Sequence, residues 1–187
     1  MKRFHTLLTM VAIAALSFTF TSCDDDEYIA DTLWGTWEGR IYVAHEWSGR
    51  YYDASRSFIY FERTNRRSGR GYWIDYYDDA PWGEDRIYSH ITWTVSNSDI
   101  KIYFEEDDYY VTIYDYQLND RYFDGYIYTY DNKRVHFQLN KTSEPIRGSY
   151  YYWDDYYYYS KQNGIVDETR ATPDTKVRPK RIFRVNE

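Results

Sequence analysis

From Trp34 to Lys141 the chain is a series of short segments in which apolar and polar residues alternate, with turn residues between them. The pattern is clearest in ITWTV (91–95) and IKIYF (100–104), which are joined by SNSD. A period of two predicts β-strands with one buried face, and connections this short favour antiparallel pairing. No segment of helical period is long enough to cross between parallel strands, so the pattern favours an all-β fold.

Eight antiparallel strands with one apolar face close most simply into a small up-and-down barrel, which leaves no exposed sheet edge. An open β-sandwich is the alternative. A barrel of eight strands can be filled by side chains or hold one small ligand; we expect a packed interior with a shallow pocket at its mouth. The expected strands span 36–47, 55–63, 71–77, 91–95, 100–104, 109–118, 122–130 and 134–141. The side chains expected to fill the barrel are Trp37, Ile41, Trp93, Ile102, Phe104, Val111, Ile113, Phe137 and Leu139.

The composition agrees with this fold class and narrows the partners. The chain contains 25 Tyr, 7 Trp and 9 Phe, and aromatic residues favour strands. Tyr and Trp have apolar bodies and polar tips, so they suit both a core and a wet surface. The formal net charge of −7 repels phosphate backbones, so nucleic acid is not an expected partner.

The first 22 residues have the layout of a secretory signal peptide. Lys2 and Arg3 precede an apolar run from about Thr6 to Phe20, which is shorter than a membrane-spanning helix. Cys23, the single cysteine, follows directly and has no partner for an intrachain disulfide. A plain secretory signal with a chance cysteine is one interpretation of this arrangement.

The other interpretation comes from a resemblance. The stretch FTSC, ending at Cys23, resembles the lipobox of bacterial lipoproteins, in particular those of Bacteroides type. The resemblance implies that Cys23 is acylated and becomes the N-terminus after cleavage. It therefore implies a protein anchored by lipid to the outer membrane.

The acidic run DDDE (24–27) comes directly after this cysteine. Clustered like charges repel one another, so the charges alone predict a solvated, flexible tether over residues 23–33. The run also looks like the surface-export signal of Bacteroides-type lipoproteins. That resemblance implies a protein that faces outward from the cell.

The first expected strand opens with LWGTWEG, which resembles the Gly-x-Trp entry motif of lipocalins, with Gly35 and Trp37 in the matching places. The strands that follow are similar to small lipocalin-like domains of Bacteroides-type lipoproteins. The resemblance covers residues 34–141, and the barrel domain is expected to span 34–142. It implies a lipocalin-like barrel and, as one function, carriage of a small apolar ligand inside it.

Residues 143–187 form a Tyr-rich C-terminal extension. SYYYWDDYYYY (149–159) is nearly symmetrical about Asp154-Asp155, which predicts a small hairpin that packs on the barrel or presents a recognition surface. The residues after it have no sustained periodicity, which predicts a mobile tail. RIFRV (181–185) is expected to form a short strand that docks on the barrel.

Catalytic and metal-binding patterns are not found. His45, His90 and His136 lack the spacing of a zinc site, and the parity of His90 and His136 points both outward, so no metal is expected. Carboxylate clusters such as EEDD (105–108) fall at turns, where we expect them to be solvated. No Gly-x-Ser-x-Gly elbow is present. We therefore expect neither enzymatic activity nor a cofactor, and a hydrolase is the least supported class.

Asp115 shares the parity of Val111 and Ile113 and is expected to face inward, either hydrogen-bonded internally or as a polar anchor for a ligand. We expect a non-catalytic binding module that recognises a glycan, peptide or host factor through exposed aromatic side chains. The alternative is the lipocalin-like carrier. The candidate ligand-binding residues are Trp73, Asp115, Tyr151, Trp153, Tyr157 and Tyr159.

Overall fold

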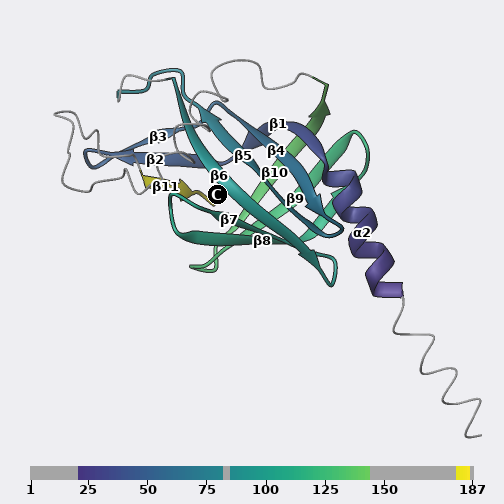
Figure 1. The fold of residues 1–187 in the computed structure, drawn as a ribbon. Helices are drawn as coiled ribbons and strands as arrows, with labels where there is room; N and C mark the ends of the chain where they lie inside the picture. The colour runs from purple at the N-terminus through teal and green to yellow at the C-terminus, as the bar shows by residue number, and fades with distance from the viewer. Residues whose placement is uncertain (1–20, 82–84, 144–179, 186–187) are drawn as a thin grey trace, which may run out of the picture.

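The computed structural model describes residues 21–81, 85–143 and 180–185, and these form a closed antiparallel barrel of eight strands (Figure 1). Around the barrel the order is β1, β10, β9, β8, β7, β6, β5 and β4, and β4 pairs back onto β1. The predicted up-and-down barrel is confirmed, and the open sandwich is wrong. The elements are α2 (Thr21–Leu33), β1 (Gly35–Ile41), β2 (Val43–Trp47), β3 (Arg50–Asp53), β4 (Arg56–Asn65), β5 (Ser68–Tyr76), β6 (Arg86–Ser96), β7 (Asp99–Phe104), β8 (Tyr109–Leu118), β9 (Tyr122–Thr129), β10 (Arg134–Thr142) and β11 (Lys180–Phe183).

Aromatic side chains fill much of the barrel interior. Every side chain expected there is buried, and Trp37, Trp73 and Trp93 are among the largest fully buried ones. The ring of Phe123 packs edge-on against Trp37 and Phe137, at centroid distances of 5.7 and 4.7 Å. The described core is therefore packed with rings in the edge-to-face arrangement that aromatic pairs prefer.

The predicted strand 36–47 is two strands with a bend at Tyr42. β1 ends at Ile41, and β2 leaves the barrel to form a hairpin with β3. Ser48 and Gly49 both have positive φ, at 50° and 74°, as a tight two-residue hairpin turn requires. Three consecutive residues of β2, Val43 to His45, are buried, so both faces of this strand are covered and the period-two pattern is lost.

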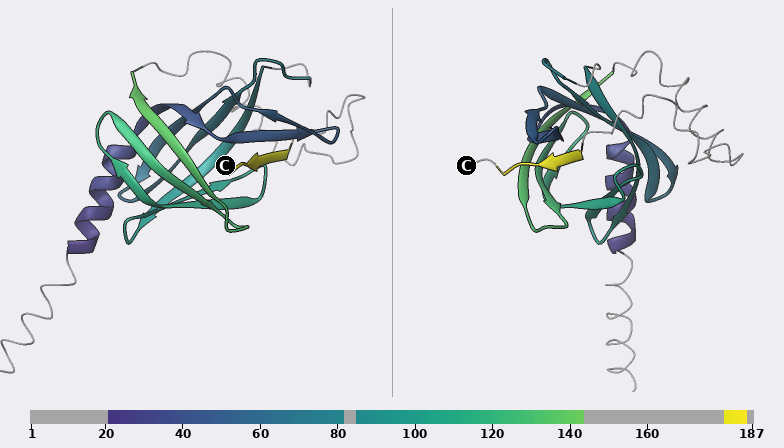
Figure 2. Two further views of the ribbon diagram at one scale, coloured as in Figure 1. Left: turned by 180° about the vertical axis from the view of Figure 1, so that it is seen from behind. Right: turned by 90° about the vertical axis from the view of Figure 1, so that its left-hand side faces the viewer.

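The segment 23–33, predicted to be a flexible tether, is helical instead. It belongs to α2, which covers one end of the barrel (Figures 1 and 2). Asp26 is only 2% exposed, because its carboxylate accepts the backbone N–H groups of Asn97 and Ser98 at 3.1 and 2.8 Å and contacts Arg67. Ala30 is also buried. The acidic run is held in place because one of its charges caps the β6–β7 turn.

The C-terminal end of α2 is joined to the barrel through the Gly-x-Trp motif. Trp37 Nε1 donates to the carbonyl of Leu33 at 2.7 Å, and Lys141 Nζ donates to that of Thr32 at 2.8 Å. These bonds satisfy carbonyls that a helix end leaves without helical partners. At Gly35 the chain turns from α2 into β1. The φ of Gly35 is 120°, a backbone conformation that residues other than glycine rarely adopt.

The opposite end of the barrel is covered by β11, which adds to β2 in a three-stranded sheet (Figure 2). The register pairs Arg181 with His45 and Phe183 with Val43. The predicted docking of RIFRV (181–185) is confirmed for residues 181–183, which belong to β11. The described barrel therefore carries α2 at one end and β11 at the other, which we call the mouth.

Candidate functional site

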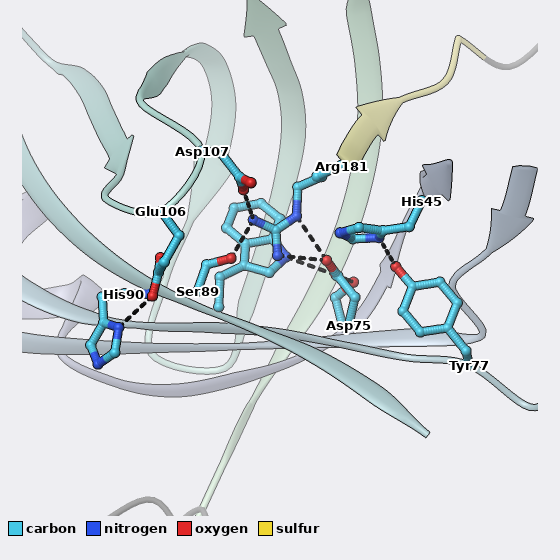
Figure 3. Close-up of polar contacts among 10 residues, drawn as sticks. His45, Asp75, Tyr77, Ser89, His90, Glu106, Asp107 and Arg181 are labelled. Atoms are coloured by element: carbon cyan, nitrogen blue, oxygen red, sulfur yellow. Dashed lines mark hydrogen bonds and ion pairs between the residues drawn. The ribbon is translucent and has the colours of Figure 1, made fainter. Parts of the chain in front are cut away.

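A buried polar cluster lies at the mouth, built by residues far apart in the sequence (Figure 3). Asp75 comes from β5 and is fully buried. Its Oδ1 accepts a hydrogen bond from Ser57 Oγ on β4 at 2.6 Å and another from Trp73 Nε1 at 2.9 Å. These two donors belong to the barrel wall, so the wall itself fixes the direction of the carboxylate.

Arg181 reaches from β11 into this cluster and is fully buried as well. Its Nε and Nη2 lie 2.9 and 2.8 Å from Asp75 Oδ2. Its Nη1 lies 2.8 Å from Ser89 Oγ and 3.3 Å from Asp107 Oδ2. The guanidinium centre is 4.6 Å from the centroid of the Phe104 ring. A planar guanidinium can make several directed hydrogen bonds and stack on a ring at once, and this one does both.

The electrostatics keep Arg181 charged. Burial alone lowers the pKa of the guanidinium, but Asp75 and then Tyr109 and Asp107 outweigh it and raise that pKa above its ordinary value. A fully buried cation is tolerated only with such compensation, since removing a charge from water costs several kcal/mol, in round terms. The Arg181 side chain therefore fills the mouth and is held there by ion pairs and hydrogen bonds, and we call it the plug.

Tyr77 and His45 adjoin the plug. The Tyr77 hydroxyl and His45 Nδ1 share a buried hydrogen bond, and the two rings meet edge to face with centroids 5.3 Å apart. Burial, and then the charge of Asp75, raise the pKa of Tyr77. The Tyr77 hydroxyl therefore stays neutral and adds no negative charge next to Asp75.

Two carboxylates of the β7–β8 turn depart from the expectation that EEDD is solvated. Asp107 contacts Arg181, as described above, and Glu106 contacts His90. Both carboxylate oxygens of Glu106 accept the backbone N–H of His90, at 3.0 and 2.9 Å. Glu106 therefore binds a donor of the barrel wall and Asp107 binds a donor of β11, whereas turn acids in general point to water.

A second group of polar and aromatic side chains lies on the outer surface of β8, β9 and β10, and we call it the tyrosine wall: Tyr114, Asp115, Tyr126, Tyr128 and Arg134. The rings of Tyr114 and Tyr128 are stacked with centroids 3.8 Å apart. The guanidinium of Arg134 lies 3.5 Å from the Tyr126 ring centroid and 2.6 Å from Asp115 Oδ2. Tyr114 is 52% exposed. The wall offers ring surface and charged hydrogen-bonding groups together.

Aromatic residues continue on the neighbouring pair of strands. Tyr103 and Tyr110 face each other in the β7–β8 register, and both are exposed. Lys101 Nζ lies 3.8 Å from the Tyr110 ring centroid. The outer surface of β7 to β10 is therefore rich in accessible tyrosine.

The predicted inward position of Asp115 is wrong. The β8–β9 register shifts between Ile113 and Asp115, where a bulge places one extra residue on β8. The shift reverses the parity, so the Asp115 side chain is 58% exposed and Tyr116 packs against the core instead. Gly125, opposite Tyr116, leaves the room for this, since a Cβ there would lie 2.6 Å from Tyr116 Cβ.

The other predicted site residues fall into three cases. Trp73 was expected on the surface, but it is fully buried and serves as a donor to Asp75, so it cannot stack on an external ligand. Cys23 lies within the bounds of α2. Tyr151, Trp153, Tyr157 and Tyr159 lie outside the described residues.

Sequence patterns do not predict the mouth cluster as a whole, although part of its signal is present. In GYWIDYY, Asp75 has the parity of Gly71 and Trp73, both buried, so the alternation marks an inward acid at this position. The partner Arg181 lies 106 residues further on, and no local pattern connects the two.

An open pocket of about 640 Å³ lies beside the mouth, where β1 passes into β2. Its lining includes Arg40 and Tyr42 from the bend and the ion pair between Asp53 and Arg184, whose atoms are 2.7 Å apart. The lining of this pocket contains none of the residues of the mouth cluster.

In the part of the chain that the structure describes, no helix has the length and apolarity needed to cross a bilayer. Within the same residues, no group of three His, Cys, Asp or Glu side chains is placed to hold a metal ion.

The fold and site define a small closed antiparallel β-barrel with a polar plug in its mouth. No family model matches the chain, and no curated protein matches it. Among solved structures, the chain is similar to a redesigned β-barrel at 14% sequence identity, covering 62% of this chain and 96% of that one with a TM-score of 0.41.

Proposed function

We propose that this protein is a lipid-anchored, non-catalytic binding module of the lipocalin-like lipoprotein type, which recognises a glycan through its tyrosine wall. The observation that carries the proposal is the juxtaposition of the stacked Tyr114 and Tyr128 rings with the Arg134–Asp115 ion pair. Exposed aromatic patches on small proteins usually mark a binding surface. Ring faces suit the apolar faces of sugars, and the ion pair suits their hydroxyl groups.

A binding screen of the full lipoprotein in detergent tests the glycan proposal. We expect saturable binding to at least one glycan on an array, and Tyr114→Ala and Arg134→Ala to weaken it about tenfold or more, by about 1.4 kcal/mol. Tyr28→Ala is the matched control, because Tyr28 is 69% exposed but lies on α2, which is not one of the three strands of the wall. An array on which no glycan binds, or equal losses in the three variants, would contradict the proposal. If only peptides bind, the ligand of the tyrosine wall is a protein and not a glycan.

The anchor is proposed from the lipobox resemblance and Cys23, and it has its own test. Cells that express the chain are labelled with radioactive palmitate, and the unmodified chain is expected to incorporate label while Cys23→Ala does not. Cys23→Ser serves as the conservative control and is also expected to remain unlabelled, because the acyl linkage requires the thiol. Surface exposure is expected to show as cleavage of the protein by protease added to intact cells.

The carrier alternative would need space inside the barrel. The interior positions of the described strands hold large side chains, including three buried tryptophans, so the packing favours the wall over the interior as the ligand site. Native mass spectrometry after gentle extraction is expected to show the acylated chain without an additional apolar ligand. A constant extra mass would support the carrier function instead.

A further inference from the structure

We propose that the mouth of the barrel is a receptor for an extended peptide of the form arginine-x-aromatic, filled here by the chain's own β11 and open to the same motif from another chain. This second site is independent of the tyrosine wall. Its ligand class is set by one guanidinium and one aromatic ring presented on alternate residues of a strand.

The receptor is assembled by the barrel wall. Asp75 is oriented by Ser57 and Trp73, and Ser89 lies on the adjacent strand β6. None of these side chains comes from β11. Removing Arg181 would therefore leave a set of acceptors that is already aligned and a buried carboxylate that lacks its cation, which favours capture of another guanidinium.

The ligand side has the features of strand addition. β11 is short, and among the described strands it sits at the edge of its sheet and pairs only with β2. Arg181 and Phe183 are buried, whereas Ile182 between them is only partly buried. In such recognition, the main chain supplies affinity and alternate side chains supply specificity.

The pocket for the second anchor is aromatic. The Phe183 ring lies 5.9, 6.2 and 6.4 Å from the ring centroids of Trp73, Phe104 and Tyr109. Phe104 also stacks beneath Arg181, so a single ring contacts both anchors. The spacing of two residues between arginine and aromatic is therefore part of the specificity.

The guanidinium is preferred over other cations for a geometric reason. The receptor places three acceptors around the guanidinium: Asp75 faces Nε and Nη2, whereas Ser89 and Asp107 both face Nη1. A lysine ammonium is a compact charge that cannot reach all three in a plane while it stacks on a ring. We therefore expect strong discrimination between arginine and lysine.

The test removes the two side-chain anchors of β11 and supplies them again on a free peptide. A free peptide competes poorly with a strand carried by the same chain, so the full chain is made as the double variant Arg181→Ala, Phe183→Ala. A fluorescent peptide Lys-Arg-Ile-Phe-Arg-Val, equivalent to residues 180–185, is titrated into it. We expect saturable binding. Citrulline or lysine at the position of Arg181 is expected to weaken binding at least tenfold.

Citrulline at the position of Arg184 is the matched control, because the pair that Arg184 makes with Asp53 is exposed, and we expect less than a threefold change. Asp75→Asn in the same background is expected to abolish the preference for arginine. Failure of the folded double variant to bind, or equal binding of the arginine and citrulline peptides, overturns the proposal. Glycan binding by the wall is measured in parallel, so the two proposals fail separately.

If the double variant does not fold, the chain is folded with Arg181 in place and then cut at a protease site inserted after Gly164. The labelled peptide is expected to displace the C-terminal fragment from the cut protein, and the Arg181-position citrulline peptide is expected to fail at the same concentration. Displacement by both peptides to the same extent, or by neither, contradicts the proposal.

Discussion

Arg181 and Asp75 form a fully buried ion pair across the mouth of the barrel, with two guanidinium nitrogens of the arginine at 2.8 and 2.9 Å from one carboxylate oxygen. The other carboxylate oxygen is occupied by Ser57 and Trp73. The pair joins β11 to β5, so the last described strand of the chain is tied to the barrel wall at its mouth.

Arg181→Ala is expected to destabilise the protein by about 3–5 kcal/mol, because it leaves a buried carboxylate without its cation. The matched control is Arg184→Ala, three residues further along. That substitution breaks only an exposed pair with Asp53 and is expected to cost about 0–1 kcal/mol. Urea denaturation followed by tryptophan fluorescence measures both free energies of unfolding. Equal losses would mean that burial of the mouth pair adds nothing.

Asp26→Ala is expected to lower the free energy of unfolding by about 1–3 kcal/mol, since the backbone N–H groups of Asn97 and Ser98 lose their acceptor. Asp25→Ala is the control, because Asp25 is exposed and adjacent in the same acidic run. Its effect is expected to stay within about 0.5 kcal/mol. Thermal unfolding followed by circular dichroism compares the two variants. Equal losses of stability would contradict a stabilising role of the Asp26 cap.

Acid is expected to weaken the β9–β10 turn through Asp131. Hydrogen bonds from Lys133 and then Thr129 hold the pKa of Asp131 below its ordinary value of 3.8. A carboxyl with a lowered pKa stabilises the folded state fully above the ordinary value, and this contribution is lost as the pH falls through the folded pKa. NMR titration should place the midpoint below 3.8, and Thr129→Ala should raise it. An unchanged midpoint in that variant would contradict the assigned cause.

Alkali is expected to act on the other end of the barrel through Tyr116. Burial, and then the charges of Asp99 and Asp26, raise the pKa of this phenol from 10.0 to about 12. The folded state therefore holds its proton more tightly than the unfolded state, so stability falls as the pH rises from 10 toward 12. The loss should be smaller in Tyr116→Phe. Chemical denaturation at a series of pH values measures it, and identical slopes for the two proteins would count against this origin.

The sequence predicts the barrel well where each strand has one buried and one wet face. ITWTV and IKIYF are such strands: the first lies in the C-terminal half of β6, and the second makes up all of β7 except its first residue. The prediction fails at Val43 to His45, because β2 is buried on both faces and alternation carries no information there. It also fails at Asp115, because a bulge adds one residue to β8 and reverses the alternation, and no residue type in the strand indicates the bulge.

The candidate site was less predictable than the fold. The tyrosine wall depends on which rings meet across three strands, and the sequence shows only that tyrosine is abundant. The mouth cluster depends on a contact between Asp75 and a residue more than a hundred positions away. Alternation gives the direction in which each side chain points, but the identity of the partner is a property of the closed barrel.

The docking of α2 on the barrel also sets the orientation that the protein would have on a membrane. With a lipid on Cys23, as proposed, the buried Ala30 follows seven positions later in the helix, a rise of about 10 Å. The end of the barrel that α2 covers would then sit close to the lipid headgroups, and the barrel would have little rotational freedom. The mouth and β11 lie at the far end (Figure 2) and would point away from the cell surface, toward whatever approaches from outside.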